Sequence, residues 1–488
     1  MAMDITKTTL SEVREAVTGK EVSAVEMTQA YLDRIAKYDG KINAYRETYD
    51  ERALERAKLV DEGKIEGPLA GVPIAIKDLM CTEYGKTCCS SKMLAKFEAF
   101  YNSTAVKRLE DAGAIVLGKT NMDEFAMGSS TETCAFGATK NPWDTDYVPG
   151  GSSGGAAAAM AADFCAGSLG SDTGGSIRQP ASLCGVTGLK PTYGRVSRWG
   201  LVAFASSLDQ IGPFGHSVKD CATLLKYMGG HDELDSTSAN IAIPEDLDDV
   251  DTKPKKLRIG IAKQYMSDEA NDPAVASALV KAIEIYKAAG AEIVEVDLPH
   301  TEYGIPVYYI VATAEASSNL ARYDGVHYGH RTQTPDDLVD LYARSRAEGF
   351  GDEVKRRIML GTYALSSGYY DAYYNRSLKV RRLISNDFKT AFESCDAILC
   401  PTTTGPAFKL GEKKDDPLSM YLNDIYTVTA NLAGIPGISM PAGTAEVDGK
   451  QMPIGMQLLG PAFEETSLLR IARIYEAATD YNLERPKM

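Results

Sequence analysis

Long apolar segments are missing from this chain of 488 residues. The longest run of small apolar residues, 156–162, is far shorter than the roughly 20 residues that cross a bilayer as a helix. The first residues, MAMDITKTTLSEVREA, lack the apolar stretch of a secretory signal. We therefore expect a soluble, cytoplasmic protein that does not interact with membranes.

The chain also has fewer cationic than anionic residues. It contains 52 lysine and arginine residues and 67 aspartate and glutamate residues, which gives a net charge of −15. A nucleic-acid-binding face needs clustered cations, so we do not expect this chain to hold nucleic acid over a broad surface. If the protein serves a reaction on nucleic acid, a partner is expected to hold that substrate.

The nine cysteines form no CxxC pair, and no histidine lies at zinc-ligand spacing from any of them. Their number is odd, and the chain is too long to depend on a disulfide framework. We therefore expect reduced thiols, as in a cytosolic protein, and no metal site in this chain.

The apolar pattern indicates short strands that alternate with helices. One strand–helix–strand unit spans 257–296, which predicts a parallel pair of strands with a right-handed crossover. Further strands are expected at 72–77, 114–117, 397–400, 437–440 and 454–459. These features predict one large α/β domain over residues 1–488, with a mixed central sheet flanked by helices on both faces.

Four segments are expected to lie outside these strands. Residues 1–65 contain two capping boxes, Thr9-x-x-Glu12 and Ser23-x-x-Glu26, which predict helices packed on the core. The glycine- and serine-rich residues 128–200 are expected to be core loops between short elements. Residues 231–256 are polar and acidic, so we expect a surface excursion, and residues 315–380 are predicted to be largely helical.

Two glycine–serine clusters lie within 30 residues of each other, GGSSGG at 150–155 and DTGGSIR at 172–178. A serine hydroxyl is a weak nucleophile until a base takes its proton. Consecutive glycines let neighbouring N–H groups turn toward one point, where they stabilise an oxyanion. Residues Thr173, Gly174, Gly175 and Ser176 could therefore supply both an oxyanion hole and a nucleophile.

The base is less obvious from the sequence, because none of the five histidines lies near either cluster along the chain. Lys77 is a competing candidate, since it ends the apolar strand predicted at 72–77. Desolvation there lowers the pKa of a lysine and leaves part of it neutral and basic. A surface lysine at a strand end fits the same pattern, and these features alone do not decide between the two.

Two further motifs are interpreted as coincidental. Residues 113–120 fit GxxxxGK[ST], but the four residues between the glycines are apolar and indicate a strand, which cannot cradle phosphates. Residues 150–154 fit GxSxG, the nucleophile elbow of α/β-hydrolases, which should follow a strand directly. The preceding residues 143–149 are polar and end in proline, so we reject this interpretation too.

The two serine clusters also belong to a longer pattern. GGSSGG at 150–155, GSLGSDTGGSIRQPASLCGVTGLKPTYGRVS at 167–197 and GVPIAIKD at 71–78 together resemble the amidase signature family. The resemblance runs over nearly the whole chain and implies a Ser–Ser–Lys triad. It places the nucleophile on Ser176, the bridging serine on Ser152 and the base on Lys77.

Within that family, three more segments are similar to the glutaminase (A) subunits of tRNA-dependent amidotransferases: 118–132, 315–325 and 356–374. That resemblance implies that the chain hydrolyses glutamine and supplies ammonia for converting Glu-tRNA(Gln), Asp-tRNA(Asn) or both into the amidated forms. It implies a heterotrimer with B and C subunits, in which the B subunit mainly holds the tRNA. ATP and Mg²⁺ belong to the partner, and no cofactor is expected in this chain.

The same resemblance implies a set of residues that bind glutamine and makes 315–380 a region for substrate and partner contacts. Arg357, or less favourably Arg356, would hold the α-carboxylate, Asp424 would hold the α-ammonium and Tyr308 would line the pocket. Each has a purely structural alternative, as an exposed helix residue, a helix start or a core aromatic. The main functional alternative is a stand-alone amidase for small carboxamides. A phosphate-loop nucleotide-binding protein is a second alternative, and a binding scaffold without catalysis is a third.

Overall fold

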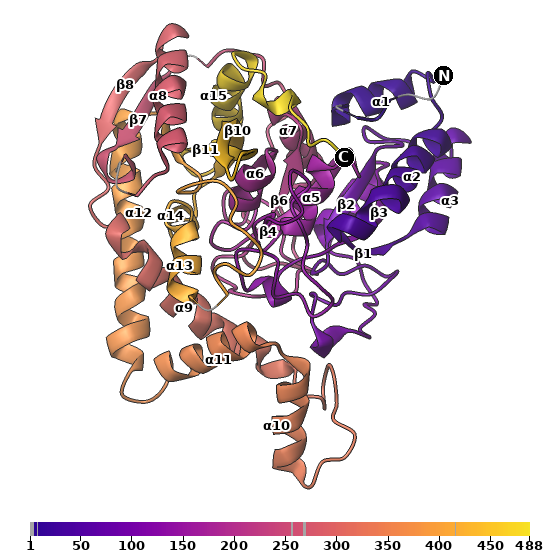
Figure 1. Cartoon of the computed structure of the whole chain (residues 1–488), viewed down its shortest axis with the longest axis vertical. Coiled ribbons are helices and arrows are strands. Elements are labelled where there is room, and N and C mark those ends of the chain that lie inside the picture. The colour runs from indigo at the N-terminus through magenta and orange to yellow at the C-terminus, as the bar shows by residue number, and fades with distance from the viewer. Residues whose placement is uncertain (1–3, 7, 255–256, 267–269, 415) are drawn as a thin grey trace.

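The computed structural model describes residues 4–488 except residues 7, 255–256, 267–269 and 415. Eleven strands in this part of the chain form one sheet, in the order β1-β3-β2-β4-β6-β5-β10-β11-β9-β7-β8 (Figure 1). They are β1 (Tyr45–Thr48), β2 (Pro73–Lys77), β3 (Ile115–Thr120), β4 (Gly167–Asp172), β5 (Thr187–Lys190), β6 (Gln210–Gly215), β7 (Arg258–Ala262), β8 (Glu292–Val296), β9 (Ala397–Pro401), β10 (Gly437–Val447) and β11 (Lys450–Leu459).

The sheet is mixed, as predicted. Strand β2 is parallel to both of its neighbours, β3 and β4, and β7 is parallel to both β8 and β9. The remaining pairs are antiparallel. The predicted strand–helix–strand unit is confirmed, because β7, α8 (Pro273–Ala288) and β8 follow one another with a parallel pairing. Strands β4 and β5 lie within residues 128–200, which were expected to be mainly loops.

Helices cover both faces of the sheet. Ile398 and Leu399 are neighbours on β9, yet they pack into different apolar clusters, and successive strand side chains point to opposite faces. The helices are α1 (Leu10–Thr18), α2 (Ala24–Ile42), α3 (Asp50–Asp61), α4 (Thr104–Asp111), α5 (Gly154–Ala161), α6 (Arg178–Cys184), α7 (Val218–Met228), α8, α9 (Gly304–Asn319), α10 (Leu338–Gly349), α11 (Asp352–Ala364), α12 (Arg376–Ser394), α13 (Pro417–Tyr421), α14 (Val428–Ala433) and α15 (Glu465–Ala477).

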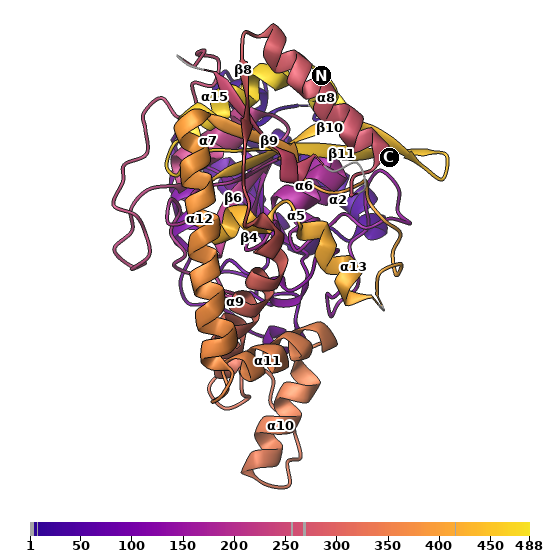
Figure 2. The same cartoon turned by 90° about the vertical axis from the view of Figure 1, so that its left-hand side faces the viewer.

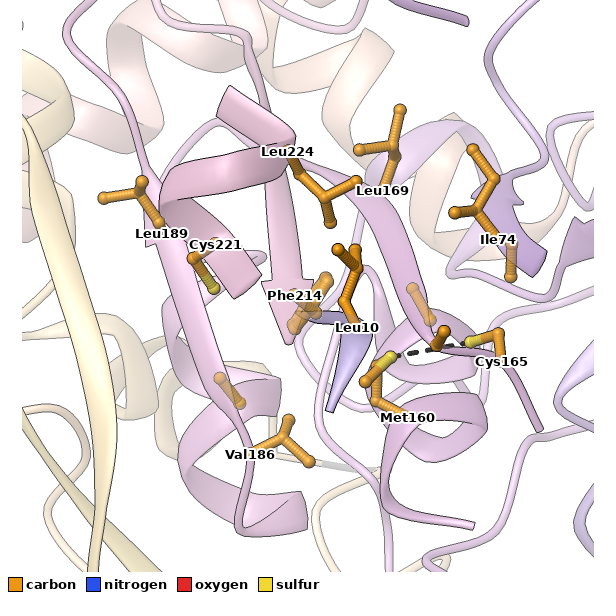
Figure 3. Packing of buried hydrophobic residues seen from close by; sticks show 14 of the residues in the cluster. Leu10, Ile74, Met160, Cys165, Leu169, Val186, Leu189, Phe214, Cys221 and Leu224 are labelled. Atoms are coloured by element: carbon orange, nitrogen blue, oxygen red, sulfur yellow. Dashed lines mark hydrogen bonds between the residues drawn. The ribbon is translucent and has the colours of Figure 1, made fainter. Parts of the chain in front are cut away.

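The first apolar cluster ties the N-terminal helix to the centre of the sheet. Both predicted capping boxes are present, at the starts of α1 and α2. Leu10 of α1 and Leu224 of α7 lie over Leu169 and Phe214 of the paired strands β4 and β6 (Figure 3). This packing buries the central strands that carry the site.

The region from 304 to 394 is helical and extends away from the sheet. Helix α9 packs on α11 and α12, and α10 projects from the body in both views (Figures 1 and 2). Residues 231–254 contain turns but no helix or strand, and 255–256, the end of the predicted excursion, lie outside the described residues. Within the described part of the chain, no helix is long and apolar enough to cross a membrane.

Helix α5 is buried on all sides, which explains its composition of glycine, alanine and one methionine. It starts directly after the GGSS segment and packs on β4 and β2. A Cβ at Gly155 would overlap the backbone of Asn121 and Ala44, so only glycine fits there. This close approach fixes the point at which Ser152 enters the core.

We predict that Gly155→Ala lowers the free energy of unfolding by about 1–3 kcal/mol, the usual cost of overpacking a rigid core. Gly40→Ala in α2 is the matched control, since a Cβ at Gly40 meets nothing within 4 Å. Thermal and denaturant unfolding of the two variants measure the difference. Equal stability of both variants would contradict the tight packing described for α5.

Candidate active site

Lys77 lies at the carboxyl end of β2, next to the parallel strand β4. The adjacent ends of parallel strands are a common place for a site in α/β proteins. The side chain of Lys77 is fully buried, so the structure excludes the surface lysine that the sequence left open.

Three serine hydroxyls surround the amine of Lys77. Its Nζ lies 2.7 Å from Oγ of Ser152, 2.8 Å from Oγ of Ser153 and 2.9 Å from Oγ of Ser171. All three serines are buried. The structure therefore brings together Lys77 and Ser152, two of the residues expected from the family resemblance, and adds two serines that sequence reasoning did not single out.

Burial lowers the pKa of the Lys77 amine to about 7, because no solvent stabilises its charged form. The carboxylates of Asp123 and Asp172 act in the opposite direction but do not outweigh the loss of hydration. Much of Lys77 is therefore neutral near neutral pH, and a neutral amine is able to accept a proton.

The loop that follows β4 carries Ser176, which is 8% exposed. Its main-chain oxygen accepts a hydrogen bond from the N–H of Ser153 at 3.2 Å, which places the two serine clusters side by side. The loop ends at α6, so Ser176 is held between a central strand and a buried helix.

A buried ion pair organises this loop. The carboxylate of Asp172 accepts hydrogen bonds from the N–H groups of Gly175 and Ile177, at 2.8 and 3.2 Å, and pairs with Arg178 at 3.1 Å. Burial alone would raise the pKa of Asp172, but the charge and hydrogen bonds of Arg178, together with Lys190 and Asn431, outweigh burial and lower the pKa to about 2. The motif DTGGSIR thus contains a buried ion pair that stabilises its own loop. The sequence analysis did not identify this ion pair.

The hydrogen bonds to Asp172 change the set of N–H groups that are expected to stabilise an oxyanion. Because the N–H of Gly175 already donates to Asp172, it is a poorer donor to an oxyanion than its neighbours. The N–H groups of Thr173, Gly174 and Ser176 remain the expected donors. A Cβ at Gly174 would overlap the ring of Tyr308, so this aromatic residue of α9 packs directly on the loop.

The two arginines considered for the α-carboxylate, Arg357 and Arg356, both lie on α11 but differ in burial. Arg357 is buried against the rings of Phe204, Tyr309 and Tyr421, and its Nε donates to Glu353 at 2.8 Å. Arg356 is exposed and also pairs with Glu353.

Asp424 is buried and accepts a hydrogen bond from the hydroxyl of Ser129 at 2.7 Å. Burial raises the pKa of its carboxyl to about 7, although Ser129 and the charge of Arg357 partly oppose the rise. Ser129 and Arg357 both line a cavity of about 600 Å³, together with Tyr421. Cavities of this size hold small molecules.

The phosphate-loop pattern at 113–120 is confirmed as coincidental. Residues Ile115–Thr120 form strand β3. Lys119 is buried, and its Nζ donates to Oγ1 of Thr87 at 2.5 Å.

The nine cysteines are all buried and unpaired.

Comparison with known proteins identifies the family of the chain. The family model described as "Amidase" matches residues 26–469. The chain belongs to the amidase family. Among solved amidase-family structures it resembles the peptide amidase of Stenotrophomonas maltophilia, with a TM-score of 0.82 and 30% identity over 99% of this chain and 98% of that one.

Greater similarity is found to proteins named as the A subunit of glutamyl-tRNA(Gln) amidotransferase. The one from Carboxydothermus hydrogenoformans is 55% identical over 490 residues, all of both chains, and the one from Heliobacterium modesticaldum is 55% identical over 98% of both. The crystal structure of the Thermotoga maritima protein of that name has a TM-score of 0.82 and 39% identity, over 99% of this amidase-family chain and 98% of that one.

We predict that the reactivity of Ser176 rises with pH around pH 7, because only the neutral form of Lys77 accepts a proton and its pKa is about 7. The rate of covalent labelling by a fluorophosphonate between pH 5 and 9 measures this dependence. Lys77→Met should label about 10²–10⁴-fold more slowly and without the rise near neutrality, as expected when a general base is lost. A wild-type profile that is flat from pH 6 to 8 would contradict the assignment.

Proposed function

We propose that this chain is the glutamine-hydrolysing component of a tRNA-dependent amidotransferase and that Lys77, Ser152 and Ser176 form its catalytic triad. The observation that carries the proposal is the buried amine of Lys77, 2.7 Å from Ser152. The identity of 55% with known amidotransferase A subunits supports the role in the larger reaction.

The hydrogen bonds around Lys77 support Ser152 as the proton donor. A neutral amine has two N–H groups and one lone pair. The hydroxyl of Ser153 donates to the carbonyl of Ser171 at 3.0 Å, so its oxygen is left to accept from Lys77. The second N–H is assigned to Oγ of Ser171, 2.9 Å away. The hydroxyl of Ser152 then donates to the lone pair and in turn accepts the proton of Ser176.

In the proposed reaction, Oγ of Ser176 attacks the side-chain carbonyl carbon of glutamine as its proton passes through Ser152 to Lys77. The N–H groups near Thr173, Gly174 and Ser176 stabilise the oxyanion. The proton then returns by the same route to the leaving nitrogen, and ammonia departs. Water, activated by the same relay, hydrolyses the glutamyl ester on Ser176 and releases glutamate.

Glutamine itself carries two opposite charges. Arg357 lines the cavity, and Asp424 is hydrogen-bonded to Ser129 of its lining, so the two offer a matching pair of charges. The guanidinium of Arg357 is the proposed partner of the α-carboxylate, which would compete with Glu353 for it. Ionised Asp424 is the proposed partner of the α-ammonium. Tyr308 packs on Gly174 of the loop that carries Ser176 (residues 173–177, the nucleophile loop) and is proposed to line the glutamine pocket.

The named relatives are subunits, so we propose that this chain works in a heterotrimer with B and C subunits in the cytoplasm. The B subunit would use the ammonia on Glu-tRNA(Gln), Asp-tRNA(Asn) or both, and would hold the tRNA, ATP and Mg²⁺. Helices of the 315–380 region expose apolar and aromatic side chains that support a role in partner contacts, including Met359, Leu360, Tyr363, Tyr369 and Tyr370.

We expect Ser176→Ala to abolish glutamine hydrolysis while amidation of the tRNA with added ammonia continues in the assembled complex. The reason is that external ammonia bypasses only the step at Ser176. Glutamate release and amidated tRNA, measured with each nitrogen source, test this. Survival of both activities would show that Ser176 is not the nucleophile.

Arg357→Met should raise KM for glutamine about 10–100-fold, the effect of losing a charged hydrogen bond to the substrate. Arg356→Met is the comparison variant: Arg356 also lines the cavity, but its side chain is exposed, so its loss should raise KM much less. Steady-state kinetics with glutamine and butyramide separate the two functions considered. Efficient turnover of butyramide by the isolated chain, unaffected by Arg357→Met, would favour a stand-alone amidase.

A further inference from the structure

A buried amide connects three parts of the site without belonging to the triad. Gln179 is the second residue of α6 and is fully buried. Its main-chain N–H donates to the carbonyl of Gly175 at 2.8 Å, within the loop that carries Ser176. The backbone of Gln179 is therefore fixed to the nucleophile loop.

The side chain of Gln179 reaches two other loops. Its Oε1 accepts a hydrogen bond from the N–H of Gly151 at 2.9 Å, and Gly151 directly precedes Ser152. Its Nε2 donates to the carbonyl of Ser129, also at 2.9 Å. One side chain thus links the loop of the bridging serine with the loop that contains Ser129.

Ser129 continues the connection to the proposed substrate charge. Its hydroxyl donates to Oδ2 of Asp424 at 2.7 Å, and Asp424 is the proposed partner of the α-ammonium of glutamine. Two side chains, Gln179 and Ser129, therefore span the distance from the ammonium site to the residue before Ser152.

The amide of Gln179 satisfies both ends of this link. Gly151 offers a donor and Ser129 offers an acceptor, so the bridging group must accept at one end and donate at the other. The reversed amide would place its NH₂ against the N–H of Gly151 and its oxygen against the carbonyl of Ser129. A Cβ at Gly150 would overlap Oε1 of Gln179, so the group is also confined sterically.

We propose that Gln179 is a positioning residue that holds the α-ammonium subsite in register with Ser152 and Ser176. The identity of the substrate in this proposal rests on the proposed function. The relative position of Gly151 and Ser129, which Gln179 fixes, does not rest on it. Small errors of register at a reacting carbonyl cost large factors in rate, because attack requires closely aligned atoms.

The fold of these loops does not depend on Gln179 alone. The carboxylate of Asp123 accepts hydrogen bonds from the N–H groups of Ser130 and Thr131 at 3.2 and 2.9 Å. The hydroxyl of Thr131 donates to the carbonyl of Gly150 at 2.8 Å. Removing the amide of Gln179 should therefore loosen the register and leave the loops in place.

The first experiment replaces the amide with an apolar group of similar length, Gln179→Met, in the assembled complex. We expect kcat/KM for glutamine to fall about 10–100-fold, through both a lower kcat and a higher KM, since two buried hydrogen bonds are lost. Asn141→Leu is the matched control, because the buried amide of Asn141 also links separate segments: it donates to the carbonyls of Val148 and Leu183, near the other end of α6, and accepts from the N–H of Trp143. It should cost similar stability with nearly unchanged kinetics.

A double-variant cycle tests the route of the effect. Ser129→Ala removes the hydroxyl that connects Ser129 to Asp424 but keeps the carbonyl that Gln179 binds. If Gln179 acts on the ammonium through Ser129, then adding Gln179→Met to Ser129→Ala lowers kcat further but raises KM little. If the KM of the double variant rises by the product of the two single-variant increases, the proposal is overturned. Wild-type kinetics for Gln179→Met would overturn it too.

Labelling of Ser176 by a fluorophosphonate separates this proposal from the proposed function. The probe has no α-ammonium, so it reports only the alignment of Ser152 and Ser176. We expect Gln179→Met to label about 10-fold more slowly than wild type, the effect of about one lost hydrogen bond. If wild type fails to hydrolyse glutamine, the proposed function is wrong, and equal labelling rates of wild type and variant would still overturn the positioning role.

Discussion

The site depends on one constraint, a lysine amine buried where its hydrogen-bond partners are neutral. Lys77 contacts three serine hydroxyls, and no carboxylate oxygen is among the hydrogen-bond partners that the structure describes for it. A carboxylate in contact would hold the amine charged and remove its basicity. Asp172 lies close enough to influence Lys77 but is itself bound by Arg178, so most of its charge is balanced within the nucleophile loop.

This arrangement separates charge balance from proton transfer. The buried carboxylates of Asp172 and Asp123 are satisfied by backbone N–H groups and, for Asp172, by an arginine. Such pairs contribute little net stability when buried, but they fix the backbone around them. The polar residues that shape the loops are therefore different from those proposed to move the proton.

The sequence predicted the fold class, the parallel unit at 257–296 and the position of Lys77 at a strand end, because each has a clear apolar pattern. It did not predict β4, whose residues GSLGSD show no apolar alternation. Both faces of β4 are buried and need small residues, since a Cβ at Gly170 would overlap Phe214 and Ser153. Ser171 and Gln179 were missed because their roles arise from contacts between segments that are distant in the chain, which a sequence pattern does not show.

The amine of Lys77 and the carboxyl of the proposed ammonium site both have to be deprotonated, so both favour a pH above about 7. In the proposed mechanism, catalysis needs Lys77 without its proton and binding needs Asp424 without its proton. Burial brings both pKa values to about 7. An incoming ammonium would favour the ionised form of Asp424 and so lower its pKa, whereas Lys77 gains no charge partner from the side-chain amide of glutamine. Substrate binding would thus secure the carboxylate and leave Lys77 as the group that sets the pH dependence of the bound state.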